Sequence, residues 1–210
     1  MRTDIVLLAA GLSSRMGKTN KLLLDVGDMS MCAFCAMQAL DYLESKEEGG
    51  TLIVVTGYRH RETEKALKIC ADRVRASGAP VHMITVHNSD YRKGQFNSTK
   101  KGVLNVSEDT PFFISLADMP DIRAGHYQRL ESLYGGQDAV RPFYSSDTGS
   151  RPGHPVLHAP SLKQRILDMP DSASVRELLA CCNTLNVPVD DSAYVNDVDC
   201  PSDWERHQAR

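Results

Sequence analysis

The stretch Asp4-Ile-Val-Leu-Leu-Ala-Ala-Gly11-Leu-Ser-Ser-Arg15-Met-Gly17 decides the fold. Its first seven residues are almost continuously apolar, as in a strand that is covered on both faces of a parallel sheet. Glycine, serine and arginine follow at once, and these residues are typical of a loop. The stretch therefore predicts a buried strand over 4–10 that opens into a polar, cationic loop.

The rest of the chain repeats this alternation of apolar runs with segments of helical periodicity. We expect strands over 51–56, 81–86 and 111–117, and helices over 31–45, 61–76 and 96–105. Such alternation predicts an α/β fold with a Rossmann-like, doubly wound and mostly parallel sheet. Beyond 120 we expect helices over 124–134, 161–167 and 175–182, strands over 139–142 and 184–189, and a polar loop over 144–153. Because no repeat or linker interrupts the pattern, a single domain over 1–210 is expected.

Composition excludes several classes of protein. The 24 basic and 27 acidic residues give a net charge of −3, and no basic cluster offers a grip on nucleic acid. No apolar run approaches the ~18 residues of a membrane span, and the first apolar run is too short for a signal peptide. We therefore expect a cytoplasmic protein without nucleic acid or membrane partners. Cys32 and Cys35 lie three residues apart in an apolar helical segment, where we expect packing in preference to redox or metal chemistry.

The loop after the first strand carries the first chemical signal. Gly11 and Gly17 let the backbone approach a ligand closely, and free N–H groups in such a loop point at anions. Arg15 and either Lys18 or Lys21 add positive charge. The spacing is neither that of a P-loop nor that of a dinucleotide-binding loop. A phosphate-rich ligand is expected here, in preference to a surface loop with solvated cations.

Asp118 carries the second signal, because it follows the apolar run 111–117. The carboxyl ends of parallel strands meet at one edge of a sheet, so Asp118 is expected near the cationic loop. Magnesium is commonly held by one or two carboxylates together with substrate phosphates. Taken alone, Asp118 would be interpreted as a cap of the turn that contains Pro120.

Six motifs occur in a definite order along the chain. They are Leu8-Ala-Ala-Gly-Leu-Ser-Ser-Arg-Met-Gly with Lys21-Leu-Leu-Leu, Val54-Val-Thr-Gly-Tyr, Asn88-Ser-Asp-Tyr-Arg-Lys-Gly-Gln-Phe-Asn-Ser98, Leu116-Ala-Asp-Met-Pro, Gly153-His-Pro-Val-Leu, and Asp197-Val-Asp-Cys-Pro-Ser-Asp. Together they resemble the motifs of the MobA-like nucleotidyltransferases, especially the molybdenum cofactor cytidylyltransferases. The resemblance extends over nearly the whole chain.

The resemblance implies a nucleotide-diphospho-sugar transferase-like fold and a defined reaction. CMP would pass from CTP, or a nucleotidyl group from another NTP, to the molybdenum–molybdopterin cofactor with Mg²⁺ and release of pyrophosphate, and a recipient molybdoenzyme is a further expected partner. The implied catalytic residues are Arg15, Lys21 and Asp118. The implied nucleotide-binding residues are Leu8, Ala9, Ala10, Gly11, Ser13, Lys21, Thr56, Gly57 and Ser98. Gly153, His154 and Pro155 would contact the acceptor, and Asp118 with Asp197 or Asp199 would bind the metal.

Several alternatives stay open at this point. Three residues separate Gly17 from Lys21 where the family usually has two, so Lys18 competes with Lys21; the following Leu22-Leu-Leu favours Lys21. Ser98 could contact the base or ribose, or cap the helix 96–105. His154 could serve the substrate or a structural turn. The competing functions are a sugar-phosphate or alditol-phosphate nucleotidyltransferase and a non-catalytic carrier of the finished cofactor.

Overall fold

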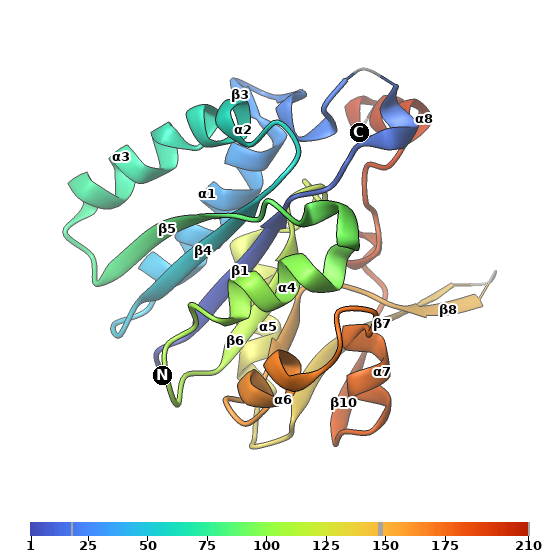
Figure 1. Ribbon diagram of the computed structural model, residues 1–210. Helices are drawn as coiled ribbons and strands as arrows, with labels where there is room; N and C mark the ends of the chain where they lie inside the picture. The colour runs from blue at the N-terminus through green and yellow to red at the C-terminus, as the bar shows by residue number, and fades with distance from the viewer. Residues whose placement is uncertain (18, 147–148, 210) are drawn as a thin grey trace.

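A computed structural model describes residues 1–17, 19–146 and 149–209 of the protein. Its main feature is a twisted sheet with helices on both faces (Figure 1). The strand order is β10-β7-β9-β6-β1-β4-β5, and β8 pairs with β7. The strands are β1 (Asp4–Ala9), β4 (Gly50–Thr56), β5 (Val81–His87), β6 (Phe112–Leu116), β7 (Ala139–Ser146), β8 (Gly149–Pro152), β9 (Val156–His158) and β10 (Thr184–Val189). A separate antiparallel pair consists of β2 (Asp25–Val26) and β3 (Met29–Ser30).

The sheet is mostly parallel. β1 lies between β4 and β6 and is parallel to both, β4 is parallel to β5, and β7 is parallel to β10. The short strand β9 lies antiparallel between β6 and β7, and β8 returns antiparallel along β7. The prediction of a doubly wound, mostly parallel α/β sheet is therefore confirmed.

Two helical layers bury the two faces of the sheet. On one face lie α1 (Met31–Glu44), α2 (His60–Ala66), α3 (Lys68–Ser77) and α5 (Ala124–Ser132); on the other lie α4 (Gln95–Val103), α6 (Leu162–Asp168) and α7 (Val175–Ala180) (Figure 1). Side chains of β1 alternate between these layers: Leu7 and Ala9 face the α1 side, and Leu8 and Ala10 face the α4 side. This alternation decides which residues of β1 can reach a ligand.

The remaining helical segments of the described residues are four short 3₁₀ helices and one α-helix. They are η1 (Ser14–Met16), η2 (Lys21–Leu23), η3 (Tyr91–Lys93), η4 (Ser192–Tyr194) and α8 (Pro201–Gln208). Within the described ranges, no helix is long and apolar enough to cross a membrane.

Two of the elements expected from the sequence differ from those in the structure. The helix expected over 61–76 is divided into α2 and α3, which meet at Leu67. The polar loop expected over 144–153 was wrong, because β7 continues to Ser146 and pairs with β8; residues 147 and 148 lie outside the described part. Cys32 and Cys35 are buried in α1, and burial raises the pKa of both thiols, as the packing interpretation requires.

Candidate active site

A cavity of about 390 Å³ opens at the carboxyl ends of β1 and β6. The loop after β1, the start of α4, the end of β6 and the segment that precedes α8 all contribute to its wall. Predicted site residues that line it are Leu8, Ala10, Gly11, Ser13, Arg15, Lys21, Ser98, Asp118, Asp197 and Asp199. The fold thus brings the cationic loop and the acidic residues into one cavity.

Lys21 lies at the centre of the charged groups. Its Nζ donates to Asp118 Oδ2 at 2.5 Å and to Asp199 Oδ1 at 2.6 Å, although 97 and 178 residues separate the partners. Only 8% of the Lys21 side chain is exposed. Burial alone would lower the pKa of Lys21, but the charges and hydrogen bonds of the two carboxylates raise it above its ordinary value. Lys21 is therefore a charged lysine held between two acids.

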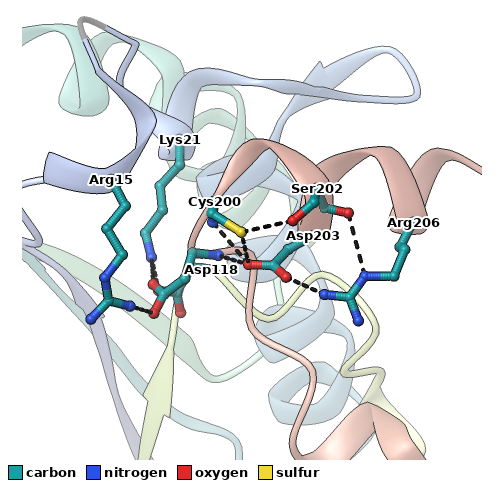
Figure 2. Close-up of polar contacts among 8 residues, drawn as sticks. Arg15, Lys21, Asp118, Cys200, Ser202, Asp203 and Arg206 are labelled. Atoms are coloured by element: carbon teal, nitrogen blue, oxygen red, sulfur yellow. Dashed lines mark hydrogen bonds and ion pairs between the residues drawn. The ribbon is translucent and has the colours of Figure 1, made fainter.

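Arg15 binds one of the two carboxylates that Lys21 binds, that of Asp199. Its Nη1 donates to Asp199 Oδ2 at 2.5 Å, while most of its side chain remains exposed. Figure 2 shows Arg15 and Lys21 extending side by side toward the acidic groups. Despite partial burial, which opposes ionisation, Lys21 and Arg15 hold the pKa of Asp199 below its usual value. The side chains of Arg15 and Lys21 thus both extend toward the acidic residues of the cavity.

The loop that presents Lys21 is stabilised by its own polar residues. Ser13 adopts a left-handed backbone conformation with a φ of 52°, and its Oγ accepts from the backbone N–H of Lys21 at 3.2 Å. Asn20 caps η2 because its Oδ1 accepts from the backbone N–H of Leu22. These bonds fix the start of η2, from which the Lys21 side chain extends to the acids.

The segment before α8 is anchored at two points. The backbone N–H of Val198 donates to the carbonyl of Asp118 at 2.9 Å. Asp203, in the first turn of α8, accepts from the backbone N–H groups of Asp199 and Cys200 (Figure 2). Hydrogen bonds from the Cys200 side chain and from these amides lower the pKa of Asp203 to about 2. Asp203 therefore positions Asp199 without lining the cavity.

A divalent cation suits two observations at this site. Asp118 Oδ1 is buried and has no hydrogen-bond partner among the described residues. Burial, together with the charges of Asp199 and Asp118, raises the pKa of Asp197. Both features indicate negative charge that is incompletely compensated, and oxygen ligands are those that Mg²⁺ prefers. Within 1–17, 19–146 and 149–209, however, no three acidic, histidine or cysteine side chains form a ready metal cluster. The residues therefore fit a cation that one or two carboxylates and a phosphate hold together.

Asp118 does not cap the turn that follows it. Its Oδ2 binds Lys21, and its Oδ1 has no partner in the described part of the chain. The open alternative of a purely structural role in that turn is thus not what the geometry shows.

Other predicted nucleotide-binding residues lie outside the cavity lining. Ala9 faces the α1 layer, because side chains alternate along β1. Thr56 is fully buried and donates to Glu64 Oε1 at 2.9 Å. Gly57 packs against Ala10 and Tyr91, and a Cβ there would come within 2.8 Å of Ala10 O. Gly57 supports the wall next to Ala10, and Ala9 and Thr56 belong to the interior, so contact of these three residues with nucleotide stays a prediction.

Ser98 lines the cavity but does not cap its helix. α4 begins at Gln95 after Gly94, so Ser98 lies within the helix. Its Oγ accepts from Asn88 Nδ2 at 2.9 Å. The capping alternative is wrong, and Ser98 remains available at the cavity surface.

The Gly153-His154-Pro155 motif lies away from this cavity. A Cβ on Gly153 would come within 2.2 Å of Tyr194 O, so this close approach requires glycine. His154 N donates to the same carbonyl at 2.8 Å, and its side chain lines a neighbouring cavity. Pro155 is buried and lines neither cavity. Of the three residues expected to contact the acceptor, only His154 has a side chain in a cavity.

Sequence reasoning missed part of the wall. Tyr91, Arg92, Gly94 and Gln95 line the cavity beside Ser98. They follow β5 at the carboxyl edge of the sheet, which was the available signal for them. Lys18, the competitor of Lys21, lies outside the described residues.

Comparisons with known proteins agree with this fold. The sequence model of the MobA-like NTP transferase domain matches residues 5–188. The molybdenum cofactor cytidylyltransferase of Escherichia coli (strain K12) is 25% identical over 208 residues, which cover 96% of this chain and 93% of that protein. The homologue of Mycobacterium tuberculosis Rv0371c from Mycobacterium sp. strain JC1 superposes with a TM-score of 0.75 at 22% identity, covering 99% of this chain and 95% of that one.

A nucleotidyl transferase from Methanothermobacter thermautotroptrophicus superposes with a TM-score of 0.73 at 20% identity, covering 99% of this chain and 96% of that one. These structures share the nucleotide-diphospho-sugar transferase fold. Because the family model matches most of the chain, the protein belongs to the MobA-like NTP transferase family.

Proposed function

We propose that this nucleotidyltransferase moves CMP from CTP to the phosphate of molybdenum–molybdopterin and releases pyrophosphate. The observation that carries the proposal is the meeting of Lys21 and Arg15 with Asp118, Asp197 and Asp199 in one cavity. Nucleotidyl transfer needs cations for the triphosphate and carboxylates for its metal, and both are present. The 25% identity to a molybdenum cofactor cytidylyltransferase supports the choice of acceptor.

The reaction needs positioning and charge neutralisation more than it needs a general base. The second pKa of a phosphate monoester is ~6, so the acceptor phosphate is already ionised near neutral pH. One of its oxygens attacks the α-phosphorus of CTP, and the bond from that phosphorus to pyrophosphate breaks. Arg15 and Lys21 bind the triphosphate and stabilise the charge that develops on the leaving group.

Asp118, with Asp197 or Asp199, would hold Mg²⁺. When bound, this ion neutralises phosphate charge during transfer. The carboxylates face the cavity, and the unpartnered Asp118 Oδ1 supports their role as ligands.

Ala10 supports the choice of cytosine. Its side chain lines the cavity and is 6% exposed, and it is fixed from behind by Gly57. The methyl group of Ala10 narrows the part of the cavity next to the backbone of the loop after β1. The narrower space favours a pyrimidine base over the larger purine. The preference for CTP over GTP is expected to be substantial but incomplete, since such exclusion contributes ~1–3 kcal/mol.

The test is pyrophosphate release from CTP, GTP, ATP and UTP, each with and without molybdenum–molybdopterin and Mg²⁺. We expect release with CTP only when the acceptor is present. Turnover with a sugar phosphate or alditol phosphate instead would contradict the acceptor. Binding of molybdopterin without turnover of any NTP would identify a carrier.

A further inference from the structure

A chain of hydrogen bonds leads from the turn after β5 to the candidate active site. The backbone N–H of Asp90 donates to Asn88 Oδ1 at 3.0 Å, and Asn88 Nδ2 donates to Ser98 Oγ at 2.9 Å. Ser98 is in α4 and lines the same cavity as Ala10, whereas Asn88 does not line it. Asn88 can therefore influence a ligand only through Ser98.

The position and the orientation of the Asn88 amide are fixed. Asn88 is 0% exposed, and its backbone N–H donates to the carbonyl of Thr56 at 2.8 Å, one residue beyond the end of β5. A side-chain amide has a donor end and an acceptor end, and its partners decide which is which. Because the backbone N–H of Asp90 needs an acceptor, the amide oxygen faces Asp90 and the amide nitrogen faces Ser98.

This orientation decides what the Ser98 hydroxyl offers to a ligand. A hydroxyl has one proton to donate and two lone pairs that accept. The Asn88 amide nitrogen uses one lone pair of Ser98 Oγ and cannot accept the hydroxyl proton. Within 1–17, 19–146 and 149–209, Ser98 Oγ makes no other hydrogen bond. The hydroxyl proton is therefore free to be donated into the cavity.

Cytosine and uracil differ in how they meet such a donor. N3 of cytosine is an acceptor, whereas N3 of uracil carries a proton, and proteins commonly read bases through hydrogen bonds to this edge. Uracil N3–H would reach only the remaining lone pair of Ser98 Oγ, and the hydroxyl proton would then have no partner. Ser98 is only 3% exposed, so an unpaired donor at this place is costly.

We propose that Asn88 is a positioning residue for the choice between cytosine and uracil, because it fixes Ser98 as a hydrogen-bond donor to N3 of cytosine. The inference rests on the nucleotide of the proposed function and extends it to a choice that Ala10 cannot make, since the two pyrimidine rings have the same size. One unpaired buried donor corresponds to a preference for CTP over UTP of about tenfold.

The first experiment measures nucleotide binding without the acceptor. Calorimetry with Mg²⁺ gives the Kd values for CTP and UTP. The wild-type protein is expected to bind CTP about tenfold more tightly than UTP. In Ser98→Ala, which lacks the donor, the two Kd values should approach each other. Equal binding of CTP and UTP by the wild-type protein, or an unchanged preference in Ser98→Ala, overturns the inference without the need for any Asn88 variant.

A double-mutant cycle separates positioning from a merely structural role. Asn88→Ala removes the donor to Ser98 Oγ and also the acceptor of the Asp90 N–H, so both nucleotides are expected to bind more weakly. If Asn88 acts through Ser98, Asn88→Ala lowers the ratio of the two Kd values in the wild-type background and leaves it unchanged in the Ser98→Ala background. An equal change of the ratio in both backgrounds overturns the inference.

Asn88→Asp reverses the hydrogen bond with almost no change in shape. The new carboxylate still accepts from Asp90 N–H, but it also accepts the Ser98 proton, so a lone pair of Ser98 Oγ faces the base. At about pH 8, where a carboxyl group is ordinarily ionised, the ratio should move about tenfold toward UTP. Asn105→Asp is the matched control, because Asn105 is exposed and outside the cavity, and its ratio should equal that of the wild-type protein.

The outcomes separate this inference from the proposed function. A preference for CTP over UTP that depends on Asn88 supports the inference even if no CMP reaches molybdenum–molybdopterin, a result that would overturn the proposed acceptor alone. Transfer of CMP by a protein that binds CTP and UTP equally would overturn the inference and leave the proposed function in place. Binding of GTP in preference to both pyrimidine nucleotides would overturn both.

Discussion

Lys21 occupies the space between Asp118 and Asp199, with its Nζ 2.5 Å from one carboxylate and 2.6 Å from the other. The lysine proposed to bind the triphosphate is thus paired with the acids proposed to hold the metal. If the proposed function holds, each ligand must displace an existing ion pair, because the triphosphate would attract Lys21 away and the metal would replace its charge. We therefore expect the binding of triphosphate and of metal to be coupled through this one side chain.

Removal of the Lys21 charge is expected to increase metal affinity in the absence of nucleotide. In Lys21→Met, Asp118 loses its cationic partner and Asp199 keeps only Arg15, and this reduced compensation of the two acids favours a divalent ion. We expect Mn²⁺ to bind about tenfold more tightly than to the wild-type protein, equivalent to ~1.4 kcal/mol, while CTP binds more weakly. Titration with Mn²⁺, followed by the electron paramagnetic resonance signal of the free ion, measures this.

Lys46→Met is the matched control for that titration. Lys46 is also largely buried and paired with one acid, Glu131, but it lies outside the cavity. Its loss is expected to leave Mn²⁺ affinity unchanged. Equal Mn²⁺ affinity in Lys21→Met and the wild-type protein would show that Lys21 does not compete with the metal.

Asp118→Asn is expected to abolish pyrophosphate release without unfolding the protein. Asparagine keeps the size of the side chain but removes the charge that pairs with Lys21 and would hold Mg²⁺. A fall in kcat of at least ~10²-fold is expected, similar to the loss of one electrostatic contact in an active site. Asp28→Asn, a change at an exposed turn, serves as the control, and circular dichroism verifies the fold. Near wild-type kcat in Asp118→Asn would remove this residue from the mechanism.

Ala10→Gly is expected to reduce the discrimination between CTP and GTP. The change removes the methyl group that narrows the slot and leaves contacts such as Ser98 in place. The ratio of kcat/KM for CTP and GTP should therefore move toward one without inverting, within the ~1–3 kcal/mol typical of steric exclusion. Preference of the wild-type protein for GTP would contradict the choice of cytidine, whereas an unchanged ratio in the variant would exclude only the role of Ala10.

Asp203 is expected to make stability depend on pH in the acidic range. Its pKa falls from 3.8 to about 2 in the folded protein, chiefly because the Cys200 side chain donates to it. A lowered folded-state pKa adds stability above the unfolded value, and this contribution is lost as pH falls from about 4 toward 2. Asp203→Ala should therefore destabilise the protein more at about pH 6 than at about pH 3, as measured by urea unfolding. An equal difference at both pH values would contradict the linkage.

The fold could be predicted from sequence wherever a strand was long and continuously apolar. Asp4–Ala9 and Gly50–Thr56 are buried on both faces, and their almost continuous run of apolar residues predicts this burial. The strand Val156–His158 escaped prediction because three residues carry too little periodicity, and its place between β6 and β7 depends on tertiary pairing.

The sequence predicted which residues line the candidate site, but not which of their side chains bind one another. The carboxyl-edge rule brought Lys21 and Asp118 to the same place, yet it could not show that their side chains bind each other. Period-two alternation places the side chain of Ala9 on the face of β1 opposite to Leu8 and Ala10, which line the cavity. Tyr91 and Gln95 lie within the motif Asn88–Ser98, but only Ser98 of that motif was expected to contact nucleotide, so their place in the wall was missed.

The hydrogen bond from Val198 N–H to the Asp118 carbonyl has a consequence for how activity is lost. The sheet is held by strand pairing and two apolar layers, whereas the segment before α8 adds no strand and is held by the packing of Val198 in the core and by polar contacts such as that of Asp199 with Lys21. Because the segment pairs with no strand, we expect its detachment to cost less free energy than opening of the sheet, and detachment would take Asp197 and Asp199 out of the cavity. Mild denaturant should therefore abolish pyrophosphate release while the backbone amides of the strands remain protected from hydrogen exchange.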